Sequence, residues 1–92
     1  MQIQNQLFPL GRLVATINAS SSLRHSEMLT ALKRHAIGDW GDLCPVDRES
    51  NDLAILTGTR LLSAYKSATG VSFWIITEAD RSATTVLLPE EY

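Results

Sequence analysis

The fold is decided by the segments RLLSAYK (residues 60–66), VSFWIITEADRS (71–82) and ATTVLLPEEY (83–92). Each segment contains a run of β-branched, aromatic or aliphatic residues, which favours a strand, and turn-forming residues separate the runs. Short connections of this kind join antiparallel neighbours. The sequence therefore predicts an antiparallel β-meander with strands at residues 60–66, 71–78 and 83–88.

The residues before the meander predict one strand and two helices. Residues 10–17 alternate well enough for a strand, and the small polar residues 18–22 read as a connector. A helix is expected over residues 26–37, with Ser26 as its N-cap and Gly38 as its terminator. A second helix begins at Pro45 and ends at Gly58, and its apolar stripe runs through Val46, Leu53, Ala54 and Leu56.

This element order, β-α-α-β-β-β, predicts an α+β fold in which the antiparallel β-meander packs against two helices. A chain of 92 residues is the size of one domain. Residues 1–9 are mostly polar, so we expect an N-terminal arm over 1–9 and a single α+β domain over 10–92.

Composition favours a soluble, globular protein of a reducing cytoplasm. Apolar residues make up 45% of the chain and charged residues 20%, which argues against disorder. No apolar run approaches the length of a membrane span, and the first residues do not resemble a signal peptide. Cys44 has no partner for an internal disulfide, and the two histidines lack metal-binding spacing. We therefore expect neither a metal nor a cofactor.

The charges divide the chain into two parts of opposite sign. Residues 1–36 carry four cations and one carboxylate, a net charge of +3, whereas residues 37–92 carry four cations and nine carboxylates, a net charge of −5. A basic patch is predicted on the first helix from Arg24, Lys33 and Arg34. Such a division suits electrostatic docking on a charged partner, although small proteins also show it without function.

The densest acidic group follows the first helix and continues into the second. Its carboxylates could perform acid–base chemistry, could hold Mg²⁺, or could present a phosphate-like array to a protein that binds nucleic acid. They also suit a turn and a helix N-terminus for purely structural reasons. The residues of this predicted acidic face are Asp39, Trp40, Asp42, Asp47, Glu49 and Asp52. The Trp40 ring could project as a binding anchor, or it could fill the interface between the sheet and the helices.

The last hairpin carries a second polar cluster, which consists of Glu78, Asp80 and Arg81. Arg81 could stabilise a phosphodiester transition state while Glu78 or His35 acts as the base. The structural alternative is an Asx-type turn closed by Asp80.

Three stretches together resemble a family of small proteins carried by plasmids, phages and other bacterial mobile elements. They are RHAIGDWGDL (residues 34–43), the spacing from DRESND (47–52) to GTRLLSAY (58–65), and WIITEADRSATTVLLPEEY (74–92). The resemblance covers residues 10–92 and departs near residues 18–24, where the family has a longer helical segment. It implies no catalytic residues.

The mobile-element context implies an inhibitor of host defence, of the anti-CRISPR or anti-restriction kind. Such a protein would be non-enzymatic, would bind a host nucleoprotein surveillance complex, and would block its binding of nucleic-acid targets. Direct contact with nucleic acid would be secondary. Two alternatives stay open: an accessory protein for plasmid maintenance, and a small ribonuclease toxin that uses His35, Tyr65, Glu78 and Arg81.

Overall fold

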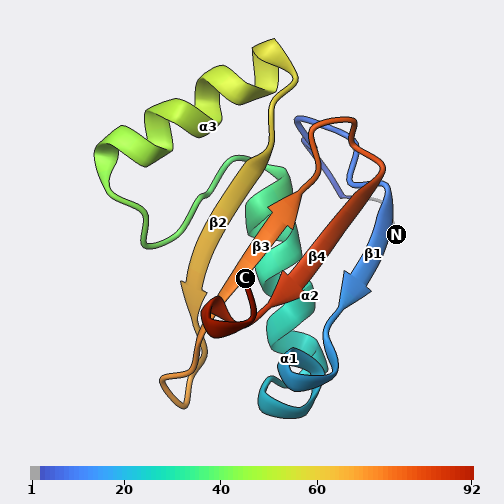
Figure 1. The fold of residues 1–92 in the computed structure, drawn as a ribbon, viewed down its shortest axis with the longest axis vertical. Coiled ribbons are helices and arrows are strands. Elements are labelled where there is room, and N and C mark those ends of the chain that lie inside the picture. Colours follow the sequence, from blue (N-terminus) through green and yellow to red (C-terminus); the bar gives the residue numbers. More distant parts are fainter. Residues whose placement is uncertain (1–2) are drawn as a thin grey trace.

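The computed structural model describes residues 3–92 and has a mixed four-stranded sheet with helices packed against it (Figure 1). The predicted α+β class is confirmed, with one additional short helix. The elements are β1 (Arg12–Ala15), α1 (Ile17–Ser22), α2 (His25–Ala36), α3 (Pro45–Thr57), β2 (Leu61–Lys66), β3 (Ser72–Thr77), β4 (Ala83–Leu87) and the 3-10 turn η1 (Pro89–Glu91).

The sheet has the strand order β1-β4-β3-β2. β2, β3 and β4 pair antiparallel, as the meander requires, with Leu61 opposite Thr77 and Thr77 opposite Thr84. β1 then adds to β4 in parallel, with Arg12 opposite Ala83. The first strand therefore lies at one edge of the sheet, beside the last strand.

The residues predicted as a connector, 18–22, instead belong to α1. The hydroxyl of Thr16 accepts a hydrogen bond from the Ala19 backbone N–H at 3.0 Å and so caps the helix. The Glu91 carboxylate accepts hydrogen bonds from the side chains of Thr16 and Asn18, while Ala19 is fully buried. Local propensity does not predict this helix, because the contacts that stabilise it come from the far end of the chain.

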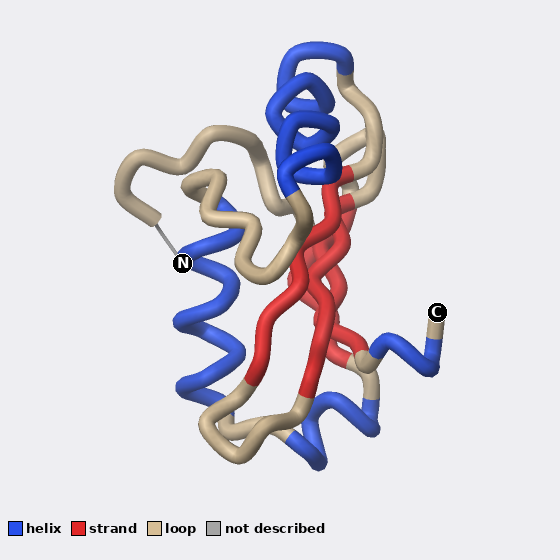
Figure 2. The backbone as a smooth tube through the Cα atoms, turned by 90° about the vertical axis from the view of Figure 1, so that its left-hand side faces the viewer, coloured by secondary structure: helices blue, strands red, loops and turns tan. Residues whose placement is uncertain are grey.

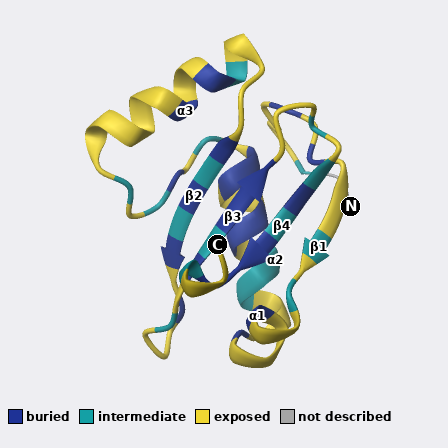
Figure 3. Cartoon of the chain, viewed as in Figure 1, coloured by how far each residue is buried: buried dark blue, intermediate teal, exposed yellow. Residues whose placement is uncertain are grey.

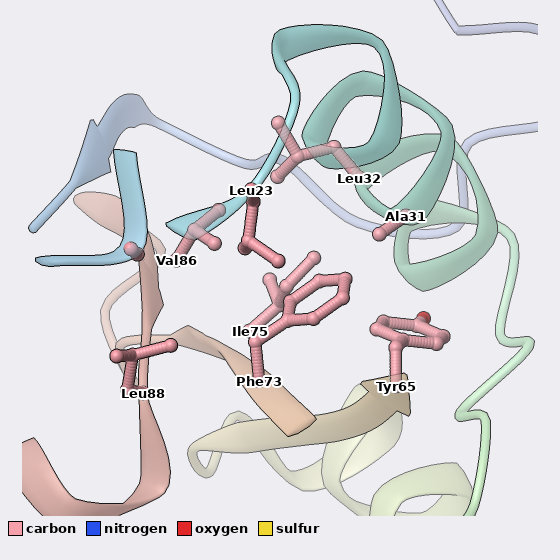
Figure 4. Packing of buried hydrophobic residues seen from close by; sticks show 9 residues of the cluster. Leu23, Ala31, Leu32, Tyr65, Phe73, Ile75, Val86 and Leu88 are labelled. Carbon is pink, nitrogen blue, oxygen red and sulfur yellow. The ribbon is translucent and has the colours of Figure 1, made fainter. Parts of the chain in front are cut away.

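α2 covers one face of the sheet, and the opposite face carries the C-terminal turn η1 (Figure 2). Ala31 and Leu32 of α2 pack over Phe73, Ile75 and Val86 (Figure 4). A second apolar cluster lies at the other end of α2 and consists of Phe8, Leu10, Ala36, Trp40, Ala54 and Leu61. Phe8 falls within the stretch predicted to be an arm, and it is buried in this second cluster.

α3 lies at the end of the sheet near β2 and is mostly exposed (Figure 3). It buries only Asn51 and Ala54. The Asn51 side chain makes two hydrogen bonds with the backbone of Leu62. Its Nδ2 donates to the Leu62 carbonyl at 2.6 Å, and its Oδ1 accepts from the Leu62 N–H at 3.2 Å. The apolar stripe predicted to face the core is therefore largely in solvent, because polar bonds from Asn51 and contacts of Ala54 fix the helix instead.

Candidate functional site

The predicted acidic face and the predicted basic patch meet in one ion pair. Nε of Arg34 lies 2.7 Å from Oδ2 of Asp39, and the bond from Arg34 lowers the pKa of that carboxyl group. The guanidinium also lies over the ring of Tyr65, 4.7 Å from its centroid. Arg34 and Asp39 therefore neutralise each other, and neither supplies a free charge to a partner.

The other two cations of the basic patch do not lie side by side. Arg24 is the N-cap of α2 and Lys33 lies nine residues further along the helix. At 100° per residue, this spacing turns the two positions to opposite sides of the helix. The prediction of one continuous basic patch is therefore wrong.

Trp40 lies in the core and does not project as an anchor. Its side chain is 3% exposed, and its ring stacks on Phe8 with the ring centroids 6.1 Å apart. The indole N–H donates to Oδ1 of Asp52 at 2.9 Å. Two members of the predicted acidic face therefore join α3 to the loop before it, which corrects the assignment of Trp40 to a binding surface.

Glu49 shares one side of α3 with exposed aliphatic side chains. Within residues 3–92, Asp42, Asp47 and Glu49 form no ion pair. Val46, Leu53 and Leu56 are 71%, 59% and 83% exposed. At 100° per residue, Val46, Glu49, Leu53 and Leu56 share one side of α3, and we call this group the α3 surface. Asp47 lies on another side of the helix, toward β2.

A hollow of about 280 Å³ lies between α3 and β2. It is lined by Leu43, Asp47, Ser50, Asn51, Arg60 and Leu62. The hollow therefore places one carboxylate and one guanidinium beside two leucines, a mixture typical of protein interfaces.

The hairpin cluster has a structural role. Oδ1 of Asp80 accepts from the backbone N–H of Ser82 at 3.0 Å, and hydrogen bonds from Ser82 lower the pKa of Asp80. The Arg81 guanidinium donates to the carbonyl of Thr59 at 2.7 Å and to that of Ala54 at 3.0 Å. Arg81 therefore caps the C-terminal end of α3, where a cation is favoured by the helix dipole.

His35 is completely buried and lies within a chain of hydroxyl groups. Its Nδ1 lies 2.6 Å from Oγ of Ser63, and its Nε2 lies 2.8 Å from Oγ1 of Thr77. Thr77 lies 2.8 Å from Oγ1 of Thr84, which donates to the carbonyl of Leu10 at 2.7 Å. Every buried polar side-chain atom of the described residues has a partner.

These contacts assign the tautomer of His35. Because the Leu10 carbonyl can only accept, Thr84 donates to it and must accept from Thr77. Thr77 then accepts from Nε2–H, and Nδ1 accepts from Ser63. Burial, together with the positive charge of Arg81, lowers the pKa of His35 to about 3. The imidazole is therefore neutral and fixed in position.

The residues considered for a ribonuclease do not form an open site. His35 is enclosed, and both terminal nitrogens of Arg81 donate to backbone carbonyls. The Tyr65 hydroxyl donates to the Asp39 carbonyl at 2.6 Å, and burial raises the pKa of that hydroxyl. Glu78, the fourth residue considered, is exposed.

Sequence reasoning missed the buried hydroxyl chain. Its signal was present, because Ser63, Thr77 and Thr84 occupy the inward positions of strands whose neighbouring inward positions are apolar. Polar residues at such positions require partners inside the core.

Across residues 3–92, no three His, Cys, Asp or Glu side chains are placed to hold a metal ion. The helices formed by these residues are too short or too polar to cross a membrane. Comparison with family models, curated proteins and solved structures gives no match to the chain.

Proposed function

We propose that the chain is a non-enzymatic inhibitor from a mobile element. In this proposal it binds a host defence nucleoprotein complex of the bacterial cytoplasm, of the CRISPR or restriction type, and blocks target binding. The observation that carries the proposal is the α3 surface, which combines three exposed aliphatic side chains with the carboxylate of Glu49.

The chemistry of this surface suits a basic groove. Exposed aliphatic groups on a helix mark an interface, because their burial against a partner is favourable. Carboxylates on and near this surface would be attracted to lysines and arginines that normally contact phosphates, and this attraction speeds docking. Arg34 and Asp39 neutralise each other, so the acidic contribution comes from Asp42, Asp47, Glu49 and Asp52.

The choice of a defence complex as partner comes from the mobile-element resemblance of residues 10–92. The inhibitor is favoured over the ribonuclease because the enclosed His35 cannot reach a scissile phosphate without opening the core. The α3 surface, in contrast, is accessible without any rearrangement.

Phage plating on an immune host tests the proposal. Expression of the chain should restore plaque formation, and affinity capture from that host should recover a defence complex. The double variant Leu53→Ser/Leu56→Ser should lose both effects while its thermal unfolding stays close to that of the wild type, because both side chains are exposed. Ile17→Ser, which removes an 85% exposed aliphatic group on α1, is the matched control and should retain both effects.

Salt dependence tests the two carboxylates of α3 that carry no hydrogen bond to Trp40. Replacing Asp47 and Glu49 by lysine should weaken the captured complex and reverse the effect of ionic strength on binding. Protection that survives both double variants would contradict the assignment to α3. Growth arrest with RNA cleavage on expression would favour the ribonuclease instead.

A further inference from the structure

The two edges of the sheet differ in whether other backbone groups cover them. The edge at β2 is covered, because the Ala64 N–H donates to the Trp40 carbonyl at 3.2 Å and the Asp42 N–H donates to the Ala64 carbonyl at 2.7 Å. The edge at β1 has no such cover among residues 3–92, since β1 pairs with β4 alone. An uncovered edge strand is a template for pairing with another chain.

The hydrogen bonds of β1 identify the backbone groups that point outward. The backbone N–H of Arg12 donates to the Ser82 carbonyl at 3.0 Å, and that of Thr16 donates to the Val86 carbonyl at 3.0 Å. Because direction alternates along a strand, Val14 also points toward β4. The N–H and C=O groups of Leu13 and Ala15 therefore point away from the sheet.

We propose that β1 pairs antiparallel with β1 of a second copy of this chain, about a two-fold axis at Val14. In this register, Leu13 of one copy lies opposite Ala15 of the other and exchanges two hydrogen bonds with it. The symmetry-related pair exchanges two more. All four outward groups of each copy are then satisfied by the same four groups of the other, as an isologous interface requires.

The side chains of β1 suit this register. Val14 of one copy would lie beside Val14 of the other copy, on the face of the sheet opposite α2, and the two would form a β-branched pair. Arg12 is the one charged residue of β1, and it would lie opposite Thr16 of the second copy. The strand therefore never places a charge opposite itself.

An apolar groove beside β1 supplies the rest of the interface. It has a volume of about 240 Å³ and lies between β1 and α2, with Leu13, Met28, Leu29 and Leu32 among its lining residues. Leu13 is 43% exposed at its mouth. Pairing would bring a second such groove alongside and remove Leu13 of both copies from water.

The resulting assembly would be a continuous eight-stranded sheet. Each copy contributes the order β2-β3-β4-β1 up to the two-fold axis, so the two α3 helices would lie near opposite ends of the assembly. This arrangement does not depend on the function proposed above, although it would make an inhibitor bivalent.

Sedimentation velocity across a wide range of protein concentrations tests the assembly. The wild type should pass from monomer to dimer as concentration rises. Ala15→Pro removes an outward N–H that has no role within the monomer and should raise the dimer dissociation constant at least about tenfold, because two hydrogen bonds are lost per dimer. Leu56→Lys, on the distant α3, should leave the dimer dissociation constant unchanged.

Disulfide trapping tests the register. In a Cys44→Ser background, Val14→Cys should form a dimer on oxidation, because residue 14 lies at a close non-hydrogen-bonded position opposite itself. Arg12→Cys should not form this dimer, because residue 12 is exposed but lies opposite residue 16 of the second copy. A chain that stays monomeric at all concentrations would overturn the proposal. A dimer that is weakened by Leu56→Lys but not by Ala15→Pro would also overturn it. A dimer that is trapped by Arg12→Cys but not by Val14→Cys would do the same.

Discussion

The indole N–H of Trp40 donates to Oδ1 of Asp52, and this bond connects the core to the exposed helix α3. Replacing Asp52 by alanine leaves the buried indole N–H without an acceptor. We expect the free energy of unfolding to fall by about 1–3 kcal/mol in urea denaturation. Glu49→Ala, on the same helix and without such a bond, should change it by less than about 0.5 kcal/mol.

The hydroxyl chain through His35 should contribute to the stability of the fold. Thr77→Val keeps the shape of the side chain but leaves Nε2–H of His35 unpaired and breaks the link to Thr84. This variant should lose about 1–3 kcal/mol of unfolding free energy. Thr85→Val makes the same chemical change on the opposite face of the sheet, where Thr85 is half-buried, and serves as the matched control.

Stability should depend on pH through His35. The pKa in the folded state is about 3, below the ordinary value of 6.5, so the unfolded chain binds a proton that the folded chain does not. This contribution is fully present above pH 6.5 and is lost as pH falls toward 3. Urea denaturation should show a loss of about 1.4 kcal/mol between pH 7.5 and 5.5.

The window above pH 5 separates His35 from the carboxyl groups. Glu27, Asp39, Asp80 and Glu91 have lowered pKa values, so their contributions are lost only at more acidic pH. A flat profile between pH 7.5 and 5.5 would show that the imidazole is accessible to protons in the folded chain.

Replacing Gly41 should destabilise the fold because of its backbone conformation. Its φ is +76°, and an added Cβ would collide with the Ala64 carbonyl where the loop covers the β2 edge. Gly41→Ala should therefore cost more than about 3 kcal/mol and shift the thermal midpoint strongly. Gly70 has a φ of +88° but open space around it, so Gly70→Ala should cost only about 1 kcal/mol.

The meander could be predicted because hydrophobic alternation and turn residues are local signals. The predicted helix of residues 26–37 also agrees with α2, which starts one residue earlier at His25. The parallel attachment of β1 could not be predicted in this way, because nothing in residues 12–15 indicates which strand they will pair with.

The candidate sites were harder to predict, because charge counts do not show which charges pair. Arg34 and Asp39 are five residues apart and were assigned to different surfaces, yet the turn after α2 brings them together. The leucines of α3 read as a core stripe, because a helical pattern shows that one face is apolar and not what covers it. Arg81 resembled a ligand for phosphate, although backbone carbonyls use its donors.

The parallel pairing of β1 with β4 has a consequence for synthesis. The two strands are separated by about 70 residues, so β1 leaves the ribosome long before its partner exists. Closing so long a loop is slow, and until it closes the chain exposes Leu13 and the groove beside it. A chaperone that holds short apolar strands would therefore encounter β1 before β4 does, and arrested nascent chains ending before residue 83 should be its clients.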